Sequence, residues 1–194
     1  MRGGQFLHWI KYHLGFDPAA TQTTDAERAA LSSHARGCRS LVEIGVFEGV
    51  TSLVLRKTMD PAGTLACVDP FFKGALGISY GLSISKREIA KSPNGSVRFV
   101  RFLSHEAAGD WSAPVDFIFI DGDHSDEGVG RDWRDWSPHI VPGGFAAFHD
   151  SVAPEGTPGP PALVRKIQSS QPDFRLVCQV DSLTIFQRRA GDKL

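Results

Sequence analysis

"LVEIGVFEGVTS", residues 41–52, is the stretch that decides the fold. Its apolar start predicts a buried β-strand, and Gly45 and Gly49 then lead into a helix expected at about residues 51–57. Glycines between a strand and a helix indicate that the backbone comes close to something. The partner can be a dinucleotide, a triphosphate, another cofactor or a neighbouring part of the chain.

Strand and helix patterns alternate from residue 40 to residue 148. Further strands are expected at 64–68, 97–102, 115–120 and 145–148, with helices at about 84–91 and 127–136. The 115–120 run is almost wholly apolar, as expected for a central strand covered on both faces. The tail "FRLVCQVDSLTIFQRR" predicts an antiparallel hairpin. The predicted fold is α/β, with a doubly wound, Rossmann-like, mostly parallel seven-stranded sheet that binds ligands beyond the carboxyl ends of its strands.

The chain before residue 38 is expected to be helical. "FLHWIKYHLG" has the pattern of an amphipathic helix, and Thr24 to Glu27 form the S/T-x-x-E pattern of a capping box that opens a helix closed by Gly37. We therefore expect an N-terminal helical segment at 1–37 and a domain at 38–190. The first helix is expected to pack on the domain, on a second subunit of a homo-oligomer, or over a site.

Composition restricts the partners and the compartment. The 194 residues carry a net charge of −1, which disfavours nucleic acid and anionic membranes as partners. Apolar runs are all shorter than the roughly 18 residues of a membrane helix. The three cysteines show no metal-ligand spacing, so free thiols and a cytoplasmic setting are predicted.

Two familiar glycine loops do not fit residues 41–52. A P-loop needs a lysine after its last glycine, and a dinucleotide fingerprint needs a glycine where Phe47 stands. The acids Glu43 and Glu48 would repel a diphosphate but not a cationic ligand. The second strand ends in Asp69, whose carboxylate can accept hydrogen bonds from both hydroxyls of a ribose. A ribose without phosphate, together with a positive charge, indicates S-adenosylmethionine.

These residues resemble the motifs of class I S-adenosylmethionine-dependent methyltransferases, over about residues 38–188. Glu43, Gly45 and Gly49 match the first motif of that family, and Asp69 matches its second-strand acid. The resemblance implies a cofactor site that comprises Glu43, Gly45, Phe47, Gly49, Thr51, Ser52, Asp69, Pro70, Phe71, Ser104, Asp121, Gly122 and His124. Phe71 would lie against the adenine or, alternatively, in the core. Ser104 stands where the family often has Gly-Asp-Ser, and Leu103 replaces the acid.

A second block, "FIDGDHSDEGVGRDWRDWSPHIVPGGFAAFHD" at 119–150, places polar residues after two strands. Adjacent parallel strands lie about 4.8 Å apart, so Asp121 and Asp150 are expected to face one small volume. The block is similar to small-molecule O-methyltransferases that have I-D-G-D-H-S-Y-E-G-V at this point, with Asp126 in place of the tyrosine. Trp133 and Trp136 are expected to pack on the sheet, and the charged residues between 131 and 135 to form a solvated face.

The resemblance to catechol-type enzymes within this class implies roles for the block. His124 would be the general base, with Asp121 as its catalytic partner, since imidazole suits proton transfer near neutral pH. Asp121, His149 and Asp150 are candidate ligands of a divalent metal such as Mg²⁺, although imidazole suits a transition metal better. Without a metal, His149 and Asp150 would hydrogen-bond the substrate or orient His124.

The predicted function is transfer of a methyl group from S-adenosylmethionine to a hydroxyl of a small, natural-product-like molecule. Phe71, Phe72 and Tyr80 are expected to line the acceptor site with the N-terminal helices and residues 151–161. One alternative is an S-adenosylmethionine-binding protein without catalysis. Another is a D-x-D nucleotide-sugar glycosyltransferase that uses Asp121 and Asp123, which leaves Glu43 unexplained.

Overall fold

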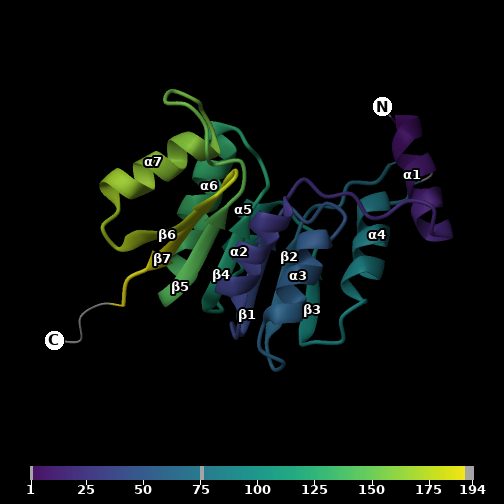
Figure 1. The fold of residues 1–194 in the computed structure, drawn as a ribbon, viewed down its shortest axis with the longest axis horizontal. Coiled ribbons are helices and arrows are strands. Elements are labelled where there is room, and N and C mark those ends of the chain that lie inside the picture. Colours follow the sequence, from purple (N-terminus) through teal and green to yellow (C-terminus); the bar gives the residue numbers. More distant parts are fainter. Residues whose placement is uncertain (1, 75–76, 191–194) are drawn as a thin grey trace.

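A computed structural model describes residues 2–74 and 77–190 (Figure 1). Seven strands form one sheet in the order β3-β2-β1-β4-β5-β7-β6. Their bounds are β1 Ser40–Ile44, β2 Thr64–Val68, β3 Ser96–Val100, β4 Val115–Ile120, β5 Ile140–Phe148, β6 Phe174–Val180 and β7 Leu183–Arg188. The pairs among β1 to β5 are parallel, and β7 runs antiparallel to β5 and β6. The predicted fold class and its terminal hairpin are confirmed.

Helices cover both faces of this sheet (Figure 1). On one face lie α2 (Asp25–Ala35), α3 (Val50–Thr58) and α4 (Tyr80–Ile89), and on the other lie α5 (Ser104–Gly109), α6 (Asp126–Trp136) and α7 (Pro160–Ser170). A short 3₁₀ helix, Ser137–His139, follows α6. Trp133 and Trp136 are 4% and 0% exposed in the core beneath the second group, as predicted. Burial of such large aromatic side chains anchors α6, and with it the turn that precedes α6, to the sheet.

The structure departs from the predicted elements at prolines and glycines. Helix α7 was not predicted because Pro160 and Pro161 indicate a loop, although proline is tolerated in the first turn of a helix. Strand β5 begins at Ile140 rather than Phe145, and Pro142-Gly143-Gly144 lie at an irregularity in its pairing with β4. Helix α5 is a six-residue helix, too short to give a periodic signal.

The N-terminal segment packs on the domain. The capping box is confirmed, because Thr24 Oγ1 accepts from Glu27 N at 3.1 Å and Glu27 Oε2 accepts from Thr24 N at 2.8 Å. Leu31 of α2 is fully buried in the same core as α3 and α4. Helix α1 (Arg2–Leu14) is held against α4 by Tyr12, whose hydroxyl donates to Glu88 Oε1 at 2.7 Å. The boundary at residues 37 and 38 stays a prediction.

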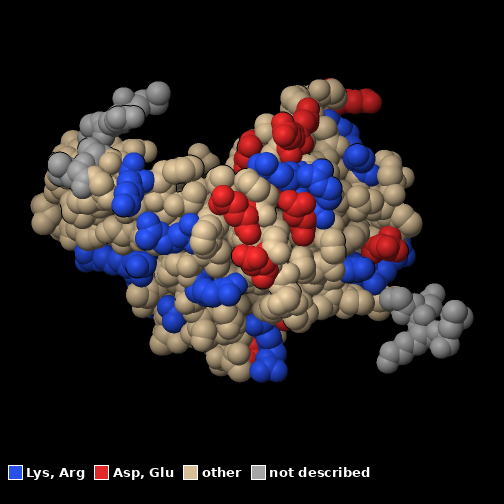
Figure 2. Space-filling view, turned by 180° about the vertical axis from the view of Figure 1, so that it is seen from behind, with Lys and Arg blue, Asp and Glu red and all other residues tan. Residues whose placement is uncertain are grey.

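The surface carries charges of both signs. Figure 2 shows the face opposite to that of Figure 1, with basic side chains in several separate groups and acidic side chains between some of them. No helix within residues 2–74 and 77–190 has the length and apolar character needed to cross a membrane. The expectations about nucleic acid and membrane partners stay predictions.

Candidate active site

The predicted site residues follow strands whose ends are aligned. Ile44 at the end of β1 pairs with Val68 of β2 and with Ile120 of β4, and Ile120 pairs with Phe148 of β5. Parallel strands present their carboxyl ends at one edge, so the residues that follow them gather there. This register brings together Gly45, Asp69, Asp121 and His149.

Gly45 and Gly49 both approach neighbouring parts of the chain itself. Gly45 has φ +83°, and a Cβ at this position would overlap the carbonyl oxygen of Asp121. Gly49 has φ +81°, and a Cβ there would lie 2.9 Å from Cα of Ser85 in α4. The conformation and the contact each require glycine. The glycines of residues 41–52 therefore approach other parts of the chain itself: Gly45 approaches the backbone after β4, and Gly49 approaches helix α4.

Three non-glycine residues that follow β1, β2 and β5 at this edge have left-handed backbone conformations. Phe47, Phe71 and Asp150 have φ values of +49°, +47° and +47°. Such conformations cost about 1–3 kcal/mol each and cluster where a site over-determines the backbone. Each of these residues lies two or three positions beyond a strand end of the candidate site.

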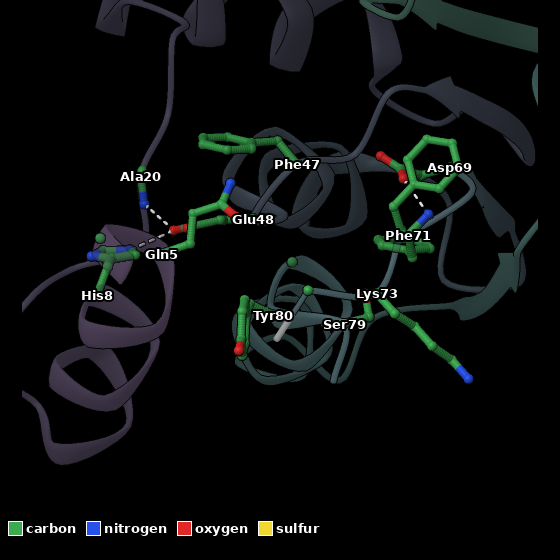
Figure 3. Close-up of a pocket in the computed structure, with 14 residues that line it drawn as sticks. Gln5, His8, Ala20, Phe47, Glu48, Asp69, Phe71, Lys73, Ser79 and Tyr80 are labelled. Carbon is green, nitrogen blue, oxygen red and sulfur yellow. Dashed lines mark hydrogen bonds and ion pairs between the residues drawn. The ribbon is translucent and has the colours of Figure 1, made fainter. Parts of the chain in front are cut away.

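The Asp69 carboxylate ties the glycine loop to the end of β2. Its Oδ2 accepts from Val46 N at 3.0 Å, and its Oδ1 accepts from Phe71 N at 2.6 Å, a contact drawn in Figure 3. A carboxylate has about four lone-pair sites, so each oxygen retains acceptor capacity. Asp69 can therefore serve the fold and a ribose at once.

A cavity of about 460 Å³ runs from Asp69 to the loop after β4. Its lining includes seven of the predicted cofactor residues, namely Gly45, Phe47, Asp69, Pro70, Ser104, Asp121 and Gly122. A smaller cavity of about 30 Å³ adjoins Glu43, Gly49 and Thr51. Two glycine-loop residues and Asp121 line both cavities, as does Gln22 of the linker before α2. Gln22 is part of no sequence motif, because only the fold brings this linker to the two cavities.

Three predicted cofactor residues line neither of these cavities. Ser52 is fully buried and donates to Glu43 Oε2, and Phe71 is 4% exposed in the core. The core position that was the alternative for Phe71 is the observed one. His124 lies outside both linings and is partly open to solvent.

Neither acid of the glycine loop is a free negative charge. Burial is the largest influence on Glu43, which is 1% exposed, and it raises the pKa of Glu43 to about 8. Glu48 is engaged elsewhere, because its Oε2 accepts from Ala20 N and lies 3.1 Å from His8 Nε2 (Figure 3). Glu48 thus fastens the N-terminal segment to the loop. Repulsion of a diphosphate by these acids, as argued from the sequence, is weaker in this structure than expected.

Replacing Glu43 with glutamine is expected to flatten the pH dependence of stability between about pH 4.5 and 6.5. The folded Glu43 carboxyl keeps its proton up to a pKa of about 8, whereas the unfolded one loses it near 4.5. The folded protein therefore holds more protons in this window, and its stability falls as pH rises, by at most about 1.4 kcal/mol per pH unit. The measurement is the free energy of urea unfolding at several pH values.

Between pH 4.5 and 6.5, the effect of Glu43 on stability can be measured separately from that of His149, whose pKa is also strongly shifted. The pKa of His149 rises from 6.5 to about 9, so its contribution to stability is lost only above that window, and in both proteins. Equal slopes for the wild type and the Glu43→Gln variant between pH 4.5 and 6.5 would contradict a protonated, buried Glu43.

Two histidines and two aspartates form one cluster after β4 and β5. Asp121 Oδ1 lies 3.2 Å from His124 Nε2 and 3.1 Å from His149 Nδ1. Asp150 Oδ2 lies 3.5 Å from His124 Nδ1, and its Oδ1 lies 3.6 Å from His149 Nδ1. The His124 side chain is 40% exposed, whereas that of His149 is 3% exposed. The cluster therefore has a solvent-facing imidazole and a buried one that share Asp121.

The residues predicted to hold a metal do not fit one in this arrangement. Within the described ranges, no group of three or more His, Cys, Asp and Glu side chains is placed to hold a metal ion. Burial opposes protonation of His149, but Asp121, Asp150 and Glu27 outweigh it and raise its pKa to about 9. Nδ1 of His149 faces the carboxylates of Asp121 and Asp150, at 3.1 and 3.6 Å, and so is already engaged by the candidate ligands themselves. We therefore derive no catalytic step through a metal.

The expected solvated face of α6 is only partly correct. Asp132 is 4% exposed, and burial raises its pKa above the ordinary value. Arg134 does form an exposed ion pair with Asp135, at 3.4 Å.

The Ser104 hydroxyl makes a hydrogen bond within the protein, because Trp136 Nε1 donates to its Oγ at 2.8 Å. Ser104 also lines the cavity of about 460 Å³, and a ligand contact by Ser104 stays a prediction.

The aromatic residues expected around the acceptor gather at another cavity, of about 650 Å³ (Figure 3). It lies between α1, the loop after β2 and the start of α4, and its lining includes Phe47, Phe71, Phe72 and Tyr80. Neither His124 nor Asp150 lines it. These aromatic residues therefore lie together but apart from the histidine cluster, and their role as an acceptor wall stays a prediction.

Proteins of known structure share this fold. A Corynebacterium glutamicum protein superposes with a TM-score of 0.72 at 15% identity, over 98% of this chain and 92% of that one. An O-methyltransferase from Bacillus cereus, solved with SAH, gives 0.69 at 15% identity, over 96% and 91%. TomG, an O-methyltransferase of tomaymycin synthesis from Streptomyces achromogenes solved with SAM, gives 0.66 at 15%, over 96% and 90%. The fold is that of the class I S-adenosylmethionine-dependent methyltransferases.

The family follows from the sequence itself. Residues 42–151, more than half of the chain, match the profile of a family described as a methyltransferase domain. The matched range begins within β1 and ends just after His149 and Asp150. The chain belongs to this methyltransferase family.

Proposed function

We propose that this protein transfers a methyl group from S-adenosylmethionine to a hydroxyl of a small molecule, with His124 as the general base. The observation that carries the proposal is the position of the His124–Asp121 pair beside the cavity that runs to Asp69. The cofactor and the oxygen acceptor agree with what the Bacillus and Streptomyces proteins are described as binding and doing.

The two cavities suit the two ends of such a cofactor. Asp69 would accept from the ribose hydroxyls in the larger cavity, whose lining reaches Asp121. A methionine-like end would enter the smaller cavity, where an ammonium group next to Glu43 would favour ionisation of this carboxyl. Gln22 of the linker would cover both ends.

Bound S-adenosylmethionine would supply an electrophilic methyl group on a sulfonium. The residues of the chain would then supply alignment and a proton acceptor. With Asp121 accepting from His124 Nε2, the His124 Nδ1 atom is left to take the proton of the acceptor hydroxyl. The hydroxyl oxygen would form its bond to the methyl carbon as the carbon–sulfur bond breaks, with S-adenosylhomocysteine as the neutral leaving group. Asp121 and Asp150 would stabilise the resulting imidazolium.

Calorimetric titration tests the proposal, first with S-adenosylmethionine and with S-adenosylhomocysteine. Micromolar binding is expected, unchanged by Mg²⁺ or EDTA. Mass spectrometry would then follow a gain of one methyl group on a panel of phenols, catechols and sugar alcohols. Absence of binding by folded protein would overturn the proposal. Binding without transfer to any acceptor would favour the non-catalytic alternative.

Replacing Asp69 with alanine is expected to weaken S-adenosylhomocysteine binding by about 10- to 100-fold. Hydrogen bonds to a charged group contribute about 1.5–3 kcal/mol, and each 1.4 kcal/mol is tenfold in affinity. The measurement is the dissociation constant by calorimetry.

Asp116→Ala is the matched control for Asp69→Ala. The Asp116 carboxylate also accepts from two backbone N–H groups, those of Arg39 at 2.7 Å and Ser40 at 3.0 Å, but at the opposite end of the sheet. Both variants should lose stability, and only Asp69→Ala should lose affinity. Equal affinities in the two variants would remove Asp69 from the cofactor site.

A further inference from the structure

The imidazole of His149 is buried and surrounded by three carboxylates. Its Nδ1 lies 3.1 Å from Asp121 Oδ1 and 3.6 Å from Asp150 Oδ1, and its Nε2 lies 3.4 Å from Glu27 Oε2. The ring edge also meets Phe119 of β4. Within the described residues, Nε2 makes no hydrogen bond, and the Glu27 carboxylate at 3.4 Å interacts with it as an ion pair. A buried imidazole with charge on both sides is a fixed element of the site.

Glu27 is held more firmly than a helix cap requires. A capping box uses one carboxylate oxygen, and Glu27 Oε2 indeed accepts from Thr24 N. Its Oε1 accepts from Ser182 N at 2.9 Å and from Ser182 Oγ at 2.7 Å, in the turn between β6 and β7. Burial opposes ionisation of this 1%-exposed side chain, but the hydrogen bonds from Ser182 and Thr24 outweigh it and hold its pKa below the ordinary value. Glu27 is therefore a fixed, buried negative charge.

We propose that Glu27 is a positioning residue of the active site, which acts through the buried His149 imidazole on the Asp121 carboxylate. The role rests on the proposed function, because Asp121 matters through its contact with His124. Glu27, on α2, holds the His149 imidazole in place. His149 Nδ1 donates to Asp121 Oδ1, and the same oxygen accepts from His124 Nε2. Asp121 is thereby prevented from turning away from the base.

Glu27→Gln is the test variant, since glutamine keeps the size and an acceptor for Ser182 but removes the charge opposite His149. We expect kcat to fall roughly tenfold, as for coupled groups in one network, with the cofactor dissociation constant within twofold of the wild type. In an NMR titration, the ¹⁵N shifts of both His149 ring nitrogens should change at a lower pH than in the wild type, because Glu27 is one of the three carboxylates that raise the pKa of His149. Glu27→Asp, which retains the charge, should recover part of both effects.

Thr24→Ala is the matched structural control. It removes the other half of the same capping box and should cost about 0.5–2 kcal/mol of stability, while kcat and the His149 shifts stay unchanged. Equal loss of kcat in Thr24→Ala and Glu27→Gln, or unchanged kcat in Glu27→Gln, would overturn the proposal. If the protein transfers methyl to no acceptor, the proposed function fails by itself, and unchanged His149 shifts in Glu27→Gln would then refute the link from Glu27.

Discussion

Replacement of His124 by alanine is expected to lower kcat by about 10²- to 10⁴-fold, the usual contribution of a positioned base. The His124 side chain is 40% exposed and contacts the two carboxylates of the cluster, so its removal leaves the core intact. It lines neither cavity assigned to the cofactor. The dissociation constant of S-adenosylhomocysteine should therefore stay within about twofold of the wild type. Steady-state kinetics and calorimetry measure the two quantities.

Two further histidine variants sharpen this result. His124→Gln can still donate to Asp121 but is a poor proton acceptor, so it should be as slow as His124→Ala. His139→Ala removes a histidine beyond the opposite end of α6 and should retain the full rate. A rate for His124→Ala within a few-fold of the wild type, at saturating cofactor, would remove His124 from the role of base.

Replacement of Gly45 by alanine is expected to cost about 3–5 kcal/mol of stability, a large part of what a domain of this size has. The left-handed backbone contributes about 1–2 kcal/mol for a non-glycine residue. The remainder comes from the overlap of the new Cβ with the carbonyl oxygen of Asp121, which is backbone and cannot turn aside. Urea unfolding followed by circular dichroism measures the loss.

Gly143 supplies the control for this substitution. Its φ is +88°, close to that of Gly45, but a Cβ there would have no atom within 4 Å. Gly143→Ala should therefore show the backbone cost alone, and the difference between the variants gives the cost of the overlap. Similar losses in the two variants would mean that the β1–α3 loop can move away from Asp121. Failure of Gly45→Ala to fold beside a folded Gly143→Ala would agree with the prediction at its upper limit.

The order and type of most elements could be predicted from local patterns. The apolar run at 115–120 predicted β4 with its observed bounds, and the S/T-x-x-E pattern predicted the start of α2. These signals are local, because burial and capping act within one strand or one turn. The signals failed where proline and glycine have a second use, as at the first turn of α7 and in the irregular start of β5.

The candidate site was predictable as a set of residues but not as a set of contacts. The prediction of a parallel sheet was enough to place Asp69, Asp121 and His149 at one edge, and the register confirms it. The predicted acceptor wall shows the limit of this reasoning. Phe72 and Tyr80 share a cavity, but its lining includes residues of α1 and not His124.

By itself, the sequence determined the succession of strands and helices along the chain, the edge at which polar residues gather and the positions that need glycine. Only the tertiary structure decided what these residues do there. In the folded chain, Gly45 lies against the backbone of Asp121, and burial raises the pKa of Glu43. Glu27, predicted from the sequence only as part of a capping box, lies beside His149. The physical reason is range, because periodicity and capping act over a few residues. Desolvation and ion pairing depend instead on groups such as Glu27 and His149, which are distant in the sequence and meet only when α2 packs on the sheet.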